Sequence, residues 1–166
     1  MHCDPGGWEG ELFDGEGFAR GMEAEGRELK GSHCALVGCG GAGAAIALAL
    51  LERSVASLSI WDVDQTKAAD LRQRLRTVTT IEISISPPTS KTDVAINATP
   101  LGMGEDDPVP MPLDLLRQDA IVADAIMKPP RTRLLREAEH RGHVIQEGRH
   151  MLDNQVEAIW SFFGLP

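Results

Sequence analysis

The stretch Cys34-Ala-Leu-Val-Gly-Cys-Gly-Gly-Ala-Gly43 decides the fold of this chain. Its first four residues are an apolar run typical of a buried strand, and the alanine- and leucine-rich run Ala42 to Arg53 favours a helix. Gly38, Gly40 and Gly43 match G-x-G-x-x-G: the first glycine permits a tight turn, the second lets the backbone approach a pyrophosphate, and the third lets helix and strand pack closely. The pattern predicts a dinucleotide site at the helix amino end, where free N–H groups attract phosphate. A tight turn without a ligand is the alternative.

Strands and helices alternate along the rest of the chain. We expect strands at Cys34–Val37, Leu58–Asp62, Ile81–Ile85, Val94–Asn97, Ala120–Ile126 and His143–Ile145, helices at Ala42–Arg53, Gln65–Arg76, Thr132–Arg141 and Arg149–Phe163, and one helical turn at Leu113–Arg117. Such alternation is typical of parallel βαβ units. The strands are continuous apolar runs, as in a sheet covered by helices on both faces. We therefore predict an α/β fold: a three-layer, Rossmann-like, doubly wound parallel sheet in a single domain.

The first thirty residues differ from the rest, because they hold seven of the 17 glycines and are strongly acidic. We expect a loop or edge strand at Trp8–Phe13 and a helix from Asp14 to Leu29, with Asp14 as its N-cap. Residues 1–30 are then a crossing segment, and residues 31–166 form the domain that ends in the last helix. The apolar residues of that helix fall on one face at helical spacing: Leu152, Val156, Ile159, Trp160 and Phe163.

Composition excludes several classes of function. The chain has 166 residues, 42% of them apolar, and a formal net charge of −9, so neither nucleic acid nor an anionic membrane is a favoured partner. The longest apolar stretch, Ala42 to Leu51, is half of the roughly 20 residues that a membrane span needs. Cys3, Cys34 and Cys39 lack metal-ligand spacing, and we expect no metal. The sparse cysteines and the absence of a signal-peptide pattern favour the cytoplasm.

A carboxylate follows the second predicted strand. Asp62 stands 19 positions after Gly43, where an acidic residue accepts hydrogen bonds from the ribose hydroxyls of adenosine. A carboxylate there repels a 2′-phosphate, and the nearest following cation is Lys67. We therefore expect NAD rather than NADP, although this expectation depends on Asp62 alone. A helix cap is the alternative role for Asp62 and the favoured role for Asp64.

The segment Asn97-Ala-Thr-Pro-Leu-Gly-Met103 ends the next predicted strand, at the sheet edge where α/β proteins bind ligands. A turn capped by Asn97 and Thr99 is the alternative. The segment resembles the NATPLGM stretch of the shikimate dehydrogenase family. Further segments resemble that family in the same order: Gly10–Phe18, the glycine turn Gly38–Gly43, Asp124–Leu135 and Gly148–Gln155.

The resemblance implies an activity. Members of the family reversibly reduce 3-dehydroshikimate to shikimate with NADPH, a step towards the aromatic amino acids, and some relatives use quinate or NAD. They combine an N-terminal substrate domain with a Rossmann cofactor domain. This sequence resembles the cofactor domain and the segment before it, and has no counterpart of the substrate domain that carries the family's catalytic lysine.

Particular residues match functional positions of the family. Asp14 corresponds to the acidic partner of the catalytic lysine, with an N-cap as its alternative role. Gln155 and Met127 correspond to substrate-binding positions. Met127 replaces a tyrosine and cannot donate a hydrogen bond. An exposed helical face is the alternative location for Gln155. Positions implied to line the cofactor are Gly38, Gly40, Gly41, Ala42, Gly43, Asp62, Asn97, Thr99, Leu101, Met103, Gly148 and Met151.

Other reactive side chains have ordinary interpretations. Lys128 precedes two prolines and is expected in solvent, and His140, His143 and His150 are expected at the surface or in loops. Cys39 lies near a helix amino end, which lowers a thiol pKa, but a small residue tolerated by the turn is the favoured interpretation.

Two classes of function remain open. One is an oxidoreductase of the shikimate dehydrogenase type, acting on a polyol carboxylate. The other is a nucleotide-binding module without turnover, which Met127 and the apolar pair Leu12-Phe13 favour because both replace polar family residues. Self-association, for instance as a homodimer, is expected in either case if apolar side chains without a cover lie on one face. The candidates are Trp8, Phe13, Phe18, Trp160 and Phe162.

Overall fold

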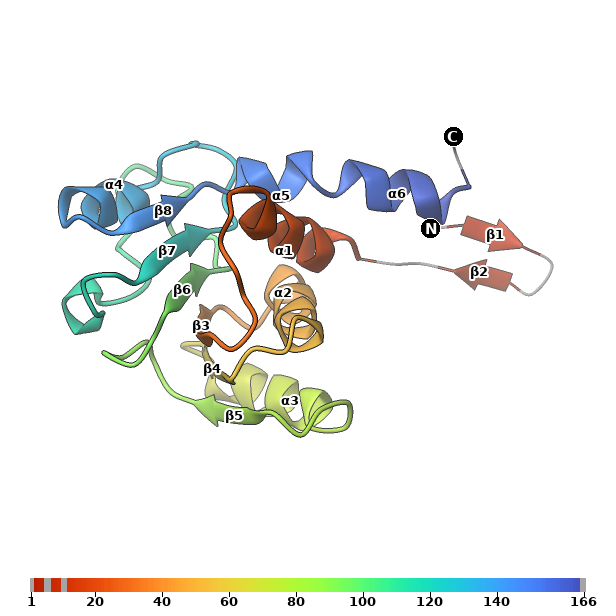
Figure 1. Ribbon diagram of the computed structural model, residues 1–166, viewed down its shortest axis with the longest axis horizontal. Coiled ribbons are helices and arrows are strands. Elements are labelled where there is room, and N and C mark those ends of the chain that lie inside the picture. The colour runs from red at the N-terminus through yellow and green to blue at the C-terminus, as the bar shows by residue number, and fades with distance from the viewer. Residues whose placement is uncertain (1, 5–6, 10–11, 165–166) are drawn as a thin grey trace.

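Six parallel strands form the centre of the molecule, in the order β5-β4-β3-β6-β7-β8 (Figure 1). The computed structural model describes residues 2–4, 7–9 and 12–164. The strands are β3 (His33–Val37), β4 (Ser57–Trp61), β5 (Glu82–Ile85), β6 (Val94–Asn97), β7 (Ile121–Asp124) and β8 (Val144–Gln146). The chain order reverses between β3 and β6, as in a doubly wound sheet. The predicted fold class is therefore confirmed.

Helices cover both faces of the sheet. The larger apolar core lies between one face and the helices α1 (Asp14–Ala24), α2 (Gly41–Glu52) and α3 (Gln65–Leu75). A smaller core lies between the other face and the segments η1 (Leu113–Leu115) and α4 (Arg133–His140). Leu36 and Ile96 point into the larger core, and Val37 and Ala95 into the smaller one. Neighbouring residues on β3 and β6 are thus buried on opposite faces, which explains why these strands are continuous apolar runs.

Local sequence fixes several helix ends. The Asp64 carboxylate accepts a hydrogen bond from the Thr66 N–H and caps α3, as predicted. Thr132 caps α4 in the same way through the Leu135 N–H. Gly142 follows the end of α4 with φ of +86°, a conformation that favours glycine.

The N-terminal segment differs from the prediction in three respects. Strands β1 (His2–Asp4) and β2 (Gly7–Glu9) form an antiparallel sheet of their own, so the expected edge strand is shorter and does not join the main sheet. Phe13, not Asp14, occupies the N-cap position of α1, which has no side-chain cap. The helix ends at Ala24, well before Leu29, because Gly26 adopts φ of +71°. The prediction of Asp14 as an N-cap was therefore wrong.

Glycines let α1 pack closely against two other helices. A Cβ on Gly15 would lie 2.1 Å from the Ala45 carbonyl oxygen of α2. A Cβ on Gly17 would lie 2.3 Å from the Met151 carbonyl oxygen, in the helix α5 (Arg149–Asp153). Phe18, on the same helix, is buried in the larger core, so its expected place in an exposed apolar patch was wrong.

The predicted last helix is two helices, α5 and α6 (Val156–Phe162). The break falls at Asn154 and Gln155, and the Cβ position of Gly17 lies 2.9 Å from the Gln155 Cβ. Close packing on α1 therefore coincides with the break. Within residues 2–4, 7–9 and 12–164, we find no helix long and apolar enough to cross a membrane.

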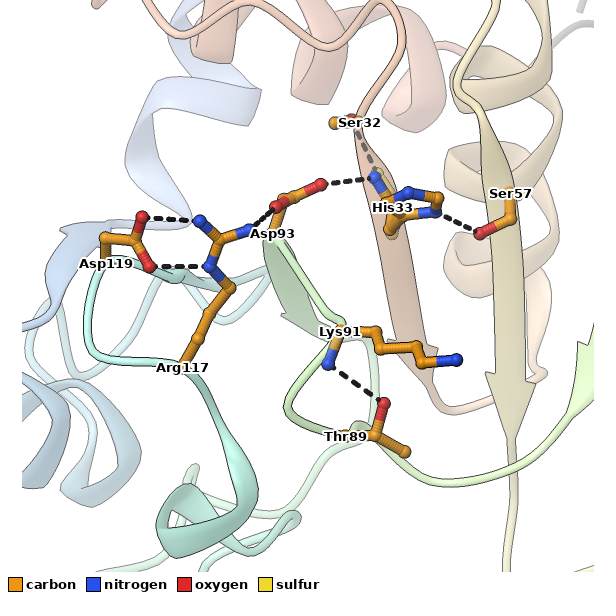
Figure 2. Close-up of polar contacts among 9 residues, drawn as sticks. Ser32, His33, Ser57, Thr89, Lys91, Asp93, Arg117 and Asp119 are labelled. Atoms are coloured by element: carbon orange, nitrogen blue, oxygen red, sulfur yellow. Dashed lines mark hydrogen bonds and ion pairs between the residues drawn. The ribbon is translucent and has the colours of Figure 1, made fainter.

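A network of polar side chains joins the amino ends of the strands, as Figure 2 shows. The Asp93 carboxylate accepts a hydrogen bond from the His33 backbone N–H at 2.7 Å and pairs with Arg117 at 2.5 Å. Arg117 also pairs with Asp119, and the His33 Nδ1 lies 2.8 Å from the Ser57 Oγ. Asp93 contacts the His33 backbone, not its imidazole, so these residues do not form a nucleophilic triad. They hold the edge opposite the glycine turn.

Candidate functional site

The glycine turn follows β3 and leads directly into α2. Gly38 has φ of +103°, and a Cβ on it would lie 2.7 Å from the Ala98 carbonyl carbon and oxygen. A Cβ on Gly43 would lie 2.0 Å from the Gly38 carbonyl oxygen. Neither position accommodates a side chain without movement of backbone. The first and third glycines of the pattern are therefore required by packing inside the protein.

The middle glycines are different. Gly40 and Gly41 are exposed, and a Cβ on either would meet no heavy atom within 4 Å. Gly40 occupies the N-cap position of α2 without a side-chain hydrogen bond, so the helix presents uncapped N–H groups there. An open backbone surface at the positive end of a helix suits a pyrophosphate. The residues present thus fit a dinucleotide, which needs the space that side chains would fill.

Asp62 lies just after β4 and beside this turn. One carboxylate oxygen accepts a hydrogen bond from the Cys39 N–H at 2.8 Å, and the other accepts one from the Asp64 N–H at 2.9 Å. The carboxylate is thereby fixed at the edge of the glycine turn, with lone pairs left for a ribose. Burial, followed by the negative charge of Asp62, raises the pKa of the Cys39 thiol to about 11, so the helix amino end does not activate this thiol.

Asn97, at the end of β6, is fully buried at 0% exposure. Its Nδ2 donates to the Leu101 carbonyl at 3.2 Å and to Asp124 at 3.0 Å. Its Oδ1 accepts from the Thr99 N–H and the Thr99 hydroxyl. The side chain is thus occupied within the protein, as in the alternative interpretation of a capped turn, and it shapes the loop that Leu101 and Met103 belong to.

Asp124, at the end of β7, received no role from the sequence. It is 1% exposed and accepts hydrogen bonds from the Thr132 hydroxyl at 2.7 Å, the Ile126 N–H at 3.0 Å and the Asn97 amide. Burial raises its pKa to about 6, although the three hydrogen bonds oppose that shift. The sequence did not indicate this, because the predicted strand ran on to Ile126, and only the structure places the end of β7 beside Asn97.

Gly148 and Met151 lie at the start of α5. A Cβ on Gly148 would lie 2.4 Å from the Ile126 carbonyl oxygen, so this glycine permits close approach of α5 to the loop after β7. Met151 is buried in the core with Phe18. Met103 is exposed on the loop after β6, where Asp107 accepts hydrogen bonds from the Gly102 and Gly104 N–H groups.

The residues predicted for the substrate side lie on other elements. Asp14 is half-buried in the first turn of α1, next to Gly15 and hence beside α2. Gln155 is 9% exposed and packs on Gly17, so an exposed helical face was the wrong alternative for it. Met127 follows β7 and is 42% exposed. The structure therefore places the glycine turn, Asp62 and Asn97 at one edge of the sheet, whereas Met151 lies in the larger core and Asp14 on the neighbouring helical layer.

The other reactive side chains differ in their exposure to solvent. Lys128 is exposed, as expected. His143 lies in the loop before β8, one of its two expected locations, but it is buried there, with its Nδ1 at 3.2 Å from the Ala120 carbonyl oxygen. A cavity of about 940 Å³ in the described part of the chain lies along α1, α2, α3 and α6, and none of the predicted cofactor residues lines it.

The parallel sheet, the glycine turn and the uncapped α2 define the class of protein as a Rossmann-type dinucleotide-binding domain. Comparison with known proteins then gives its relatives. The chain is 36% identical over 159 residues to the shikimate dehydrogenase (NADP(+)) of Rubrobacter xylanophilus. The aligned region covers 92% of this chain and 56% of that protein. No family model matches the chain.

Solved structures agree with this relationship. The shikimate 5-dehydrogenase of Listeria monocytogenes, in complex with shikimate and NAD, superposes with a TM-score of 0.87 at 26% identity, over 97% of this chain and 61% of that one. The quinate dehydrogenase of Corynebacterium glutamicum, in complex with NAD, gives 0.80 at 30% identity, over 94% and 58%. The resemblance to the shikimate dehydrogenases is thus confirmed, and the chain spans little more than half the length of these relatives.

Proposed function

We propose that this chain is the nicotinamide-nucleotide-binding half of an oxidoreductase of the shikimate dehydrogenase type. The observation that carries the proposal is the open, uncapped amino end of α2 beside a carboxylate fixed for a ribose. The backbone of Gly40 and Gly41 would hold the pyrophosphate, and Asp62 the adenosine ribose. The bound nicotinamide supplies the hydride.

We propose NAD as the preferred cofactor. The Asp62 carboxylate would face the 2′-phosphate of NADP, and like charges a few ångströms apart repel. Lys67 is exposed, and its charge acts on Cys39 in the turn, where it partly opposes the rise of the thiol pKa, so it is the cation that a 2′-phosphate would use.

Replacement of Asp62 tests this preference. Asp62→Ser should weaken NAD binding and strengthen NADP binding, changing the ratio of the two dissociation constants by about tenfold or more. Titration of both nucleotides against wild type and variant measures the ratio. Asp64→Ser, which changes a neighbouring carboxylate that caps α3, should leave the ratio unchanged. An Asp62→Ser ratio equal to that of wild type would contradict the assignment.

The proposed substrate is a polyol carboxylate, either shikimate with its oxidised partner 3-dehydroshikimate, or a quinate-type relative. The residue matches of Asp14, Gln155 and Met127 support this class, together with the names of the relatives. Asp14 would share a proton with the catalytic lysine as hydride adds to the carbonyl carbon. In the family, that lysine lies in the domain that the resemblance does not cover.

Nucleotide binding without turnover is the second candidate. It is favoured by Met127, which cannot donate the hydrogen bond of the tyrosine it replaces. The experiment follows the absorbance of reduced nicotinamide with shikimate and quinate, and titrates cofactor binding in the same samples. Turnover that is lost in Asp14→Asn would support the oxidoreductase, and binding without turnover would support the module. Absence of both would overturn the proposal.

We also propose that the chain associates with itself and acts in the cytoplasm. Support for self-association comes from exposed apolar side chains on α5 and α6, with Trp160 at 51% exposure, and from the adjoining groove that Leu12, Phe13 and Phe162 line. Support for the location comes from Cys34 and Cys39, which are free, buried thiols and suit a reducing compartment.

A further inference from the structure

A continuous series of contacts runs along the carboxyl edge of the sheet, from the glycine turn to α5. The Cβ position of Gly38 lies 2.8 Å from the Thr99 nitrogen, so the turn and the loop after β6 touch through backbone. Asn97 holds that loop and bonds to Asp124, and Asp124 holds the Ile126 N–H. The Ile126 carbonyl in turn lies against Gly148.

Asp124 stands at the middle of this series. Its partners come from three segments: Asn97 from β6, Ile126 from the loop after β7, and Thr132 from the N-cap of α4. All three are uncharged donors, so the ionised carboxylate is satisfied by hydrogen bonds alone. None of these segments is adjacent in sequence to the glycine turn. A buried carboxylate that accepts from three segments fixes their relative positions more strictly than apolar contact does.

We propose that Asp124 is the positioning residue of the proposed nucleotide site. Through Asn97 it sets the loop 99–103 against the glycine turn, and through Ile126 and Thr132 it sets the segment 126–132, which carries Met127. It does not touch the nucleotide itself. This inference rests on the proposed function, since it names the group that fixes two loop segments of the same site relative to each other.

Two substitutions of Asp124 distinguish a positioning role from a general contribution to the stability of the fold. Asp124→Ala leaves the Asn97 amide, the Ile126 N–H and the Thr132 hydroxyl without their acceptor. Asp124→Asn keeps an oxygen for Asn97 and Ile126, and its new N–H₂ can donate to the Thr132 hydroxyl once that hydroxyl turns. Asp93→Ala is the matched control, because Asp93 also joins strands through a backbone N–H, but at the opposite edge.

The measurements are the dissociation constants of NAD and NADP, the thermal midpoint, and amide hydrogen exchange. Asp124→Ala should weaken nucleotide binding about tenfold or more, since at least one buried donor is left unpaired. Asp124→Asn should restore most of the affinity. Asp93→Ala should lower the thermal midpoint while it changes affinity less than about twofold. Equal losses of affinity in Asp124→Ala and Asp93→Ala would overturn the proposal.

Hydrogen exchange keeps the test independent of nucleotide binding. In Asp124→Ala, amides of residues 99–103 and 126–132 should exchange faster, while those of β4 and α3 stay protected. If wild type binds neither nucleotide, the proposed function fails, and exchange still decides the positioning role. If Asp124→Ala does not fold, Thr132→Val removes one donor and should accelerate exchange in 126–132. Unchanged exchange in both segments would overturn the inference.

Discussion

At the scale of single residues, the four glycines of the turn serve two different purposes. Gly38 and Gly43 are excluded from carrying a side chain by the protein's own backbone, whereas Gly40 and Gly41 face open space. A sequence pattern cannot separate these purposes, because all four positions read as glycine. The structure separates them by what a Cβ would meet, and each purpose predicts a different defect.

Gly40→Ala should therefore lose nucleotide affinity, and Gly43→Ala should lose stability. In Gly40→Ala the thermal midpoint should stay near that of wild type, because Gly40 has an ordinary φ of −78° and a free Cβ position, while nucleotide affinity falls. In Gly43→Ala the clash at 2.0 Å should cost about 1–3 kcal/mol of unfolding free energy. Chemical denaturation and nucleotide titration measure both. A stable Gly40→Ala variant with unchanged affinity would remove the pyrophosphate assignment.

Asp124 predicts a pH dependence of stability. Its folded pKa of about 6 lies above the ordinary value of 3.8, so the folded state binds more protons than the unfolded state between these values. The contribution of Asp124 protonation to the free energy of unfolding is complete below the ordinary pKa of 3.8, and it is lost as the pH rises through the folded pKa of about 6.

Replacement by asparagine removes this titration. Relative to Asp124→Asn, wild type should lose about 1 kcal/mol of unfolding free energy between about pH 5 and about pH 7.5. Urea denaturation of both proteins at the two pH values measures the difference. Parallel pH curves for the two proteins would mean that Asp124 titrates near its ordinary pKa.

At the scale of elements, the sequence predicted the βαβ units well, because their causes are local. The apolar runs of β3 and β6, the Asp64 cap and the glycine turn are all decided by neighbours in the chain. The break between α5 and α6 was missed, because the apolar spacing continues across it while its packing partner, Gly17, lies far away in sequence. The Asn97–Asp124 bond was missed for the same reason.

Gly17 therefore predicts how α5 depends on α1. Gly17→Ala should lower the free energy of unfolding by about 1–3 kcal/mol, since its Cβ would meet the Met151 carbonyl at 2.3 Å. Exchange protection should fall in α5 before it falls in α3. Gly41→Ala is the matched control, because the same change in α2 meets no atom within 4 Å and should leave stability unchanged or raise it. Comparable destabilisation in both variants would contradict the role of the close α1–α5 contact.

At the scale of the whole molecule, apolar surface is distributed unevenly. Leu152 on α5, Val156 and Trp160 on α6 and Phe163 just after α6 are all exposed, although their spacing predicted only that they share a face. Phe162 packs edge-on against Phe13, with ring centroids 5.5 Å apart, which joins α6 to the start of α1. Exposed apolar side chains gathered on one segment in this way are typical of an interface.

Self-association through this surface should depend on Trp160. The apparent mass from light scattering should rise with concentration in the tens of micromolar range, and Trp160→Glu should reduce it to that of a monomer. Val144→Glu is the control, because Val144 is equally exposed on β8, on the opposite side of the molecule in Figure 1. A wild-type protein that stays monomeric throughout this range would contradict the prediction.

The contact between the glycine turn and the loop after β6 also limits how this protein can diversify. Gly38 contacts Ala98 and Thr99 through main-chain atoms, so no side-chain substitution at this contact can change ligand preference. New cofactor or substrate preferences must arise on the rim, at positions such as Asp62, Met103 and Met127, whose side chains are at least partly exposed. An engineer who wishes to redirect this scaffold would keep 38–43 and 97–99 unchanged and build libraries on that rim.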